Sequence, residues 1–138
     1  MIDKVDIVRL YEAAVATRKN SYSPYSKFAV GAVCILKTGE YVLGCNVENA
    51  SYGLCNCAER TALFSLIAQG YKKEDIIEMV IIADTLKPVS PCGACREVMK
   101  ELLNEDVVVT LFNLKKDVVT LKVKDLLPYS FDKGDLNG

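Results

Sequence analysis

The sequence predicts an α/β fold, a single domain over residues 1–138 in which helices cover a mixed sheet of about five strands. Two observations lead to this prediction. Segments whose apolar residues recur at three- and four-residue steps alternate along the chain with short apolar, often β-branched runs. The 138 residues contain no repeat, no low-complexity tract and no linker rich in Pro, Gly and Ser, and this length is typical of one domain.

The first third of the chain predicts one helix followed by a hairpin. Residues 3–18 have the apolar spacing of a helix, and Asp3 is a suitable N-cap. The runs 28–36 and 41–47 predict two strands, because both are apolar and rich in β-branched residues. They are joined by a short polar segment that contains Gly39, which favours a tight turn.

The rest of the chain alternates between helix and strand. We predict a helix at 57–69, closed by Gly70, and an apolar strand covered on both faces at 76–83. The later elements are a helix from Pro91 to about residue 103, strands at 107–112 and 118–123, a short helical turn before Pro128, and a polar tail.

Charge and hydropathy exclude several classes of protein. Lys and Arg number 17 and Asp and Glu number 18, so the net charge is 17 − 18 = −1, without the basic excess of chains that neutralise nucleic-acid phosphates. No apolar run approaches the ~20 residues of a membrane span. Asp3 and Asp6 stand where a signal peptide needs positive charge. We therefore expect a cytoplasmic protein without nucleic-acid or membrane partners.

Histidine is absent, which excludes any catalytic triad, metal site or general base that depends on imidazole. In a reducing compartment, cysteines are more often metal ligands, catalytic thiols or core residues than disulfide partners. The sequence has six of them: Cys34, Cys45, Cys55, Cys57, Cys92 and Cys95. Cys34 and Cys45 lie in predicted strands and are expected in the core.

Cys92 and Cys95 stand at the predicted start of a helix, three residues apart, so their sulfurs share one helix face. Free N–H groups and the helix dipole favour thiolates there. Two thiolates at this spacing can hold zinc, although the same pair also fits a redox dithiol or half of a zinc ribbon.

Cys57 strengthens the zinc interpretation, because it also precedes a predicted helix. If the two helix starts converge, three thiolates surround one point and leave a fourth zinc position open for water, which is the catalytic arrangement. Zinc would lower the pKa of that water toward ~7. Glu59 could then lie beside the water as a proton shuttle, and Arg60 could donate hydrogen bonds to a ligand sulfur.

The segments Cys57-Ala58-Glu59 and Pro91-Cys92-Gly93-Ala94-Cys95 resemble the zinc signature of nucleoside and base deaminases. The match is to the small, homotetrameric, three-cysteine type of the cytidine/deoxycytidylate deaminase family, and it covers nearly the whole chain. Further matching segments, in order, are residues 22–28, 30–32, 46–53, 90–96 and 126–128, with Phe131.

This resemblance implies a three-layer α/β/α fold and one Zn²⁺ per subunit, held by Cys57, Cys92 and Cys95. It implies hydrolytic deamination of cytidine and deoxycytidine to the uracil nucleosides and ammonia, a step of pyrimidine salvage. Water activated by zinc attacks C4 of the base. Glu59 protonates ring N3 and delivers a proton to the departing amine, and such general acid–base help is worth ~10²–10⁴-fold.

The resemblance also implies which residues bind substrate. Asn46 and Glu48 lie two apart on an extended segment, so their side chains share a face and could hold a ribose hydroxyl as donor and acceptor. Phe28 resembles the aromatic that packs on the pyrimidine, and Ala58 is a further expected contact. Phe131 resembles the aromatic that enters a neighbouring subunit's pocket, so active sites are expected to be shared within a homotetramer.

Three alternatives stay open at this point. Cys55 could join the other three cysteines in a closed, structural Cys₄ zinc site of a binding module. The Cys92–Cys95 pair could be a metal-free oxidoreductase dithiol. The deaminase chemistry could also act on a modified nucleoside, a free base or an antibiotic built on cytosine, although Asn46, Glu48 and Phe28 favour an ordinary nucleoside.

Overall fold

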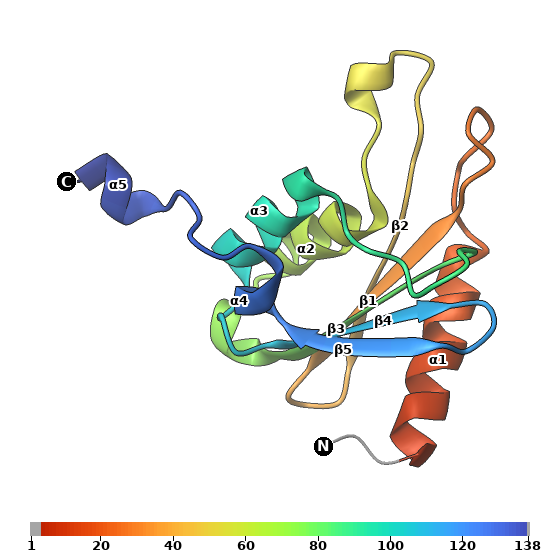
Figure 1. Ribbon diagram of the computed structural model, residues 1–138, viewed down its shortest axis with the longest axis horizontal. Helices are drawn as coiled ribbons and strands as arrows, with labels where there is room; N and C mark the ends of the chain where they lie inside the picture. Colours follow the sequence, from red (N-terminus) through yellow and green to blue (C-terminus); the bar gives the residue numbers. More distant parts are fainter. Residues whose placement is uncertain (1–3, 138) are drawn as a thin grey trace.

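The computed structural model describes residues 4–137, so the predicted N-cap Asp3 lies outside the described residues. Five strands form one sheet in the order β2-β1-β3-β4-β5 (Figure 1). The strands are β1 (Val30–Leu36), β2 (Tyr41–Cys45), β3 (Ile76–Ala83), β4 (Val108–Asn113) and β5 (Val118–Lys122). β3 and β4 are parallel, and every other neighbouring pair is antiparallel. The predicted mixed sheet is therefore confirmed.

Helices cover both faces of this sheet, which gives the expected three layers (Figure 1). The long helix α1 (Lys4–Arg18) packs on one face, whereas α2 (Ala58–Ala68) and α3 (Gly93–Leu102) pack on the other. The short α4 (Val123–Leu126) follows β5, and α5 (Lys133–Asn137) lies near the end of the chain, where only a polar tail was expected. Between residues 4 and 137, no helix combines the length and apolarity that crossing a membrane requires.

Two hydrophobic clusters hold the layers together. β1 is buried along its whole length, because both of its faces are covered. On the α1 side, Leu10 and Ala14 pack against Val33, Val80 and other buried strand residues. The opposite cluster is larger and places α2 and α3 against the sheet through residues such as Ala62, Leu63 and Met99.

Two glycines let helices approach the sheet more closely than any side chain would allow. A Cβ on Gly44 of β2 would lie 2.4 Å from the backbone nitrogen of Ala62 and 2.5 Å from the carbonyl oxygen of Ala58. A Cβ on Gly31 of β1 would lie 2.6 Å from the carbonyl oxygen of Ala14 in α1. The absence of a side chain at Gly44 therefore allows the first turns of α2 to pack directly against the backbone of β2.

Most predicted boundaries agree with the structure, and the differences have local causes. The predicted strand 41–47 ends at Cys45, because Val47 leaves the sheet and pairs with Asn56 through two backbone hydrogen bonds of 2.9 Å. β3 matches the prediction but is not wholly apolar. Its Glu78 is buried and accepts a hydrogen bond of 2.7 Å from the hydroxyl of Thr110, and burial raises its pKa.

Candidate metal centre

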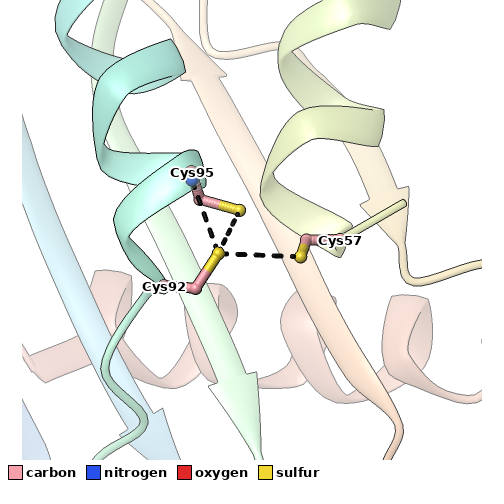
Figure 2. Close-up of side chains that lie close together, drawn as sticks. All are labelled: Cys57, Cys92 and Cys95. Carbon is pink, nitrogen blue, oxygen red and sulfur yellow. Dashed lines mark hydrogen bonds between the residues drawn. The ribbon is translucent and has the colours of Figure 1, made fainter. Parts of the chain in front are cut away.

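Two helix N-termini converge on the larger side of the core. Cys57 is the N-cap of α2, and Cys92 is the N-cap of α3. Figure 2 shows the sulfurs of Cys57, Cys92 and Cys95 turned toward one another between the two helices. The backbone N–H of Cys95 donates to Cys92 Sγ at 3.5 Å. The positive ends of both helix dipoles therefore point toward this group of sulfurs, a setting that favours negative charge.

The sulfur positions fit a zinc ion. Cys57 Sγ lies 3.9 Å from Cys92 Sγ, and Cys92 Sγ lies 3.4 Å from Cys95 Sγ. All three sulfurs lie within 4.8 Å of one another. Zn–S bonds of ~2.3 Å in tetrahedral geometry separate two sulfurs by about 3.8 Å, so little movement is needed to hold the ion. Three sulfur donors leave one tetrahedral position for a further ligand.

Arg60, in the first turn of α2, contacts these sulfurs. Its Nη2 donates a hydrogen bond of 3.2 Å to Cys57 Sγ. The pKa of Cys57 is lowered to about 5, first by a hydrogen bond from the Cys95 thiol and then by the bond and charge of Arg60. The same Cys57–Cys95 interaction raises the pKa of Cys95, because the second proton of the pair leaves against an existing thiolate. Arg60 thus offsets part of the negative charge of the cluster.

Glu59 occupies the first turn of α2, next to Cys57, and is only 5% exposed. Burial is the main cause of its raised pKa, and the charge of Cys57 acts in the same direction. The rise in pKa is opposed first by a hydrogen bond from the backbone of Glu59 and then by interactions with Cys95 and Arg60. This carboxyl can therefore hold a proton at a higher pH than an exposed glutamate can.

Asn46 and Glu48 both turn toward the segment that leads into β1. Asn46 Nδ2 donates to the carbonyl oxygen of Phe28 at 2.7 Å, and its Oδ1 accepts from the Val30 N–H at 2.8 Å and from the Ser21 hydroxyl. The side chain is thus a brace for the backbone beside Phe28. One Nδ2 hydrogen is not used by these bonds.

Glu48 is held by the turn that precedes Phe28. Its Oε1 accepts from the N–H groups of Tyr25 at 3.0 Å and Ser26 at 3.1 Å, and its Oε2 accepts from the Ser26 hydroxyl. The Ser26 hydroxyl bond is the largest cause of its lowered pKa, so the carboxyl is a fixed anionic acceptor. Together with Tyr52 and Cys55, these residues line an open cavity of about 250 Å³.

The other predicted contacts differ in their surroundings. Phe28 is 43% exposed just before β1, whereas Ala58 is fully buried, with its carbonyl oxygen against Gly44. Phe131 is 61% exposed and lines a surface hollow with α3 residues that include Glu97 and Lys100. This hollow does not include the residues that line the cavity beside Glu48.

The structure separates Cys55 from the sulfur cluster. Cys55 Sγ accepts from the Asn49 N–H at 3.3 Å and lies 3.6 Å from the Asn49 carbonyl oxygen, so it closes its own loop. Among the described residues, only Cys57, Cys92 and Cys95 form a candidate metal group, which disfavours the closed Cys₄ site. Cys34 is buried, which raises its pKa to about 12, and Cys45 is partly buried. All six cysteines are free thiols.

Residue-by-residue reasoning missed the groups that position Asn46 and Glu48. Ser21 was not singled out, and Tyr25 and Ser26 entered only as part of the matching segment 22–28. The available signal was the cluster of Ser and Pro residues at 21–26, whose hydroxyl and N–H groups commonly satisfy neighbouring polar side chains in turns.

Comparison with known proteins gives one consistent result. Residues 5–111 match the model of a family described as the cytidine and deoxycytidylate deaminase zinc-binding region. The cytidine deaminase of Halalkalibacterium halodurans is 47% identical over 133 residues, which cover 96% of this chain and 99% of that protein. The crystal structure of cytidine deaminase from Burkholderia pseudomallei superposes with a TM-score of 0.87 at 50% identity, covering 90% of this chain and 98% of that one. The Mycobacterium tuberculosis enzyme superposes with a TM-score of 0.77 at 32% identity, covering 94% and 99%.

Proposed function

The chain belongs to the cytidine and deoxycytidylate deaminase family, and on that premise we propose which of its residues bind and deaminate the nucleoside. It catalyses the zinc-dependent hydrolysis of cytidine to uridine and ammonia. The observation that carries the proposal is the cluster of Cys57, Cys92 and Cys95 beside the buried carboxyl of Glu59. Deoxycytidine is expected as a second substrate.

Cys57, Cys92 and Cys95 would hold one zinc ion per subunit, with Arg60 offsetting the charge of the Cys57 thiolate. When bound, the ion supplies a Lewis acid that lowers the pKa of a water molecule toward ~7. The two helix N-termini keep the sulfurs in place before the metal arrives, so the fold contributes pre-organisation.

Glu59 is the proposed proton carrier. Its carboxylate takes a proton from the attacking water and gives it to ring N3, so that C4 can accept the new C–O bond while the ring loses its aromaticity. The carboxylate then takes the hydroxyl proton and gives it to the amine, which leaves as ammonia. A pKa raised by burial suits this role, because the group must both gain and release a proton near neutral pH.

Of the proposed substrate contacts, Glu48 lines the cavity described above. We expect the ribose hydroxyls to donate to Glu48, whose orientation is fixed by Tyr25 and Ser26, and to accept from the spare Nδ2 hydrogen of Asn46. The exposed ring of Phe28 would pack on the pyrimidine face. The backbone of Ala58, in the first turn of α2, would contact the base.

We further propose that the protein is one domain that assembles as a homotetramer with shared active sites. Exposed apolar side chains support assembly, because the partly exposed Phe64 and Ile67 lie one turn apart on α2, and Tyr52 and Leu54 project from the loop before it. Phe131 would enter a neighbouring subunit's pocket. A reducing, cytoplasmic location would keep the zinc ligands as thiols, and neither nucleic acid nor a membrane is an expected partner.

The decisive test is the change in ultraviolet absorbance when zinc-replete protein is mixed with cytidine, with ammonia release measured in parallel. We expect cytidine to be converted to uridine with an equal amount of ammonia. A flat trace from protein with one zinc per chain would refute the assignment and favour a purely structural metal site.

A further inference from the structure

Arg96 makes three side-chain hydrogen bonds that join two distant segments. Its Nε donates to the carbonyl oxygen of Pro91 at 2.8 Å, and its Nη2 donates to the hydroxyl of Ser90. Its Nη1 donates to the carbonyl oxygen of Leu126 at 2.8 Å. Ser90 and Pro91 directly precede Cys92, whereas Leu126 is the last residue of α4, so one guanidinium holds both segments.

Hydrogen bonds to β4 hold the earlier part of the loop that precedes Cys92. After β3, the Val89 N–H donates to the carbonyl oxygen of Phe112 at 3.3 Å, and Asn113 Nδ2 donates to that of Leu86 at 3.2 Å. These bonds hold the start and middle of the loop. Arg96 holds its end, where the backbone sets the direction of the Cys92 side chain.

The chain that Arg96 holds at Leu126 continues to Phe131, which is held by a second residue of α3. Lys100 lies one turn beyond Arg96 on α3, and residues four apart share a helix face. Lys100 Nζ donates to the carbonyl oxygen of Phe131 at 2.9 Å and lies 3.9 Å from a carboxylate oxygen of Asp132. One face of α3 therefore fixes the chain at both ends of residues 126–131, between α4 and α5 (Figure 1).

We propose that Arg96 is a positioning residue that links the loop supplying Cys92 to the segment carrying Phe131, so that metal retention and nucleoside binding both depend on it. The inference rests on the proposed function, in which Phe131 contacts nucleoside in a neighbouring subunit. In each subunit, Arg96 would thereby couple the position of Cys92 in its own metal centre to the position of Phe131, which contacts nucleoside in the neighbouring subunit.

Arginine is suited to this role and lysine is not. The guanidinium is planar and presents its donors in a fixed fork, so it can serve acceptors on two segments at once, whereas an ammonium is a compact point charge. Pro91 and Leu126 are both buried residues, so carbonyl oxygens that lose Arg96 would have restricted access to water as a replacement donor.

The test compares Arg96→Lys with two variants that each disturb one end of the link. Ser90→Ala removes a contact on the metal side, and Lys100→Met removes the contact with Phe131. Arg9→Met, on the exposed surface of α1, is the matched control for losing an arginine. For each zinc-loaded protein, zinc retention is measured by competition with a chromogenic chelator, and KM and kcat for cytidine are measured separately.

We expect Arg96→Lys to weaken zinc retention about tenfold, as loss of an outer contact around a metal ligand does, and also to raise KM. Ser90→Ala should weaken zinc retention alone. Lys100→Met should raise KM alone, by about fivefold, the size expected for one hydrogen bond. Arg9→Met should match the unchanged protein.

The link is refuted if Arg96→Lys keeps either quantity at its original value, or if only its melting temperature falls. Ser90→Ala and Lys100→Met are single-contact changes that carry the test if Arg96→Lys does not fold. Failure of the proposed function is distinguishable, because it removes cytidine turnover from the unchanged protein, whereas failure of the link leaves that turnover intact.

Discussion

Arg60 donates a hydrogen bond of 3.2 Å to the sulfur of Cys57, three residues earlier in the chain. Cys57 is the N-cap of α2 and Arg60 lies in its first turn, so the geometry of the helix start brings the cation and the sulfur together. This local pair stabilises the anionic form of one sulfur before any metal binds. Several expected outcomes follow from it and from its surroundings.

Replacing Arg60 by Gln should raise the pKa of the Cys57 thiol. In zinc-free protein that pKa is about 5, so the reactive thiolate is present above that pH and is lost as the pH falls through it. Without the cation, the midpoint should move upward by about 1–3 units. Site-resolved alkylation of zinc-free protein across pH, read by mass spectrometry, measures this midpoint. An unchanged midpoint would mean that Arg60 does not stabilise the thiolate.

Replacing Glu59 by Gln should leave zinc bound and reduce kcat by about 10²–10⁴-fold, because the amide cannot carry the proton. Metal content and cytidine turnover are measured on the same sample. Glu74→Gln, a change at an exposed glutamate between α2 and β3, is the control and should retain full turnover. Wild-type turnover in Glu59→Gln would remove Glu59 from the mechanism.

Replacing Cys55 by Ser should leave the zinc content at one ion per chain, because its thiol bonds the Asn49 backbone and lies outside the sulfur cluster. Replacing Cys95 by Ser should empty the site or weaken it strongly, since a ligand is lost. Metal analysis of both purified variants makes the comparison. Loss of zinc in Cys55→Ser would restore the closed four-cysteine site.

Replacing Gly44 by Ala should destabilise the protein by about 1–3 kcal/mol, because the new methyl group would overlap the backbone of α2 at Ala58 and Ala62. The melting temperature should fall by several degrees. Gly53→Ala is the matched control, since apart from its neighbours in the chain no heavy atom lies within 4 Å of its added Cβ. Equal melting temperatures for the two variants would show that α2 can move away from β2 without cost.

Replacing Phe131 by Ala should raise KM for cytidine while zinc content and oligomeric state stay unchanged. The side chain is largely exposed in the protomer, so its removal costs little folding energy, and its proposed contact lies in a neighbouring subunit. Steady-state kinetics with metal analysis and light scattering check this. Unaltered KM would show that Phe131 has no role in nucleoside binding.

Much of the fold was predictable because local patterns specify local structure. β3 spans the predicted residues, and the predicted helices at 57–69 and from Pro91 differ from α2 and α3 only at their ends. The apolar period and the capping residues act within a few positions, so they can be read without knowledge of the partner elements. The unpredicted α5 lies in a polar stretch that has no such period.

The candidate ligands could also be proposed from sequence, because Cys57, Cys92 and Cys95 each stand at a predicted helix start and match a family signature. The sequence alone could not separate Cys55 from Cys57, since both precede α2 by a few residues. Tertiary contacts distinguish the two cysteines: Cys55 Sγ accepts a hydrogen bond from the Asn49 N–H in its own loop, whereas Cys57 Sγ lies near sulfurs of residues 35 or more positions later in the chain.

The helix and strand pattern could thus be predicted from sequence, because it depends on neighbours along the chain, and the three cysteines could be proposed because they match a family signature. Only the tertiary structure decided that Asn46 braces the backbone at Phe28 and Val30, and that Arg96 joins Pro91 to Leu126. These contacts join residues far apart in sequence. The pairing of β1 with β2 brings Asn46 to Phe28 and Val30, whereas the position of α3 brings Arg96 to Leu126. No periodicity in the chain encodes such distances.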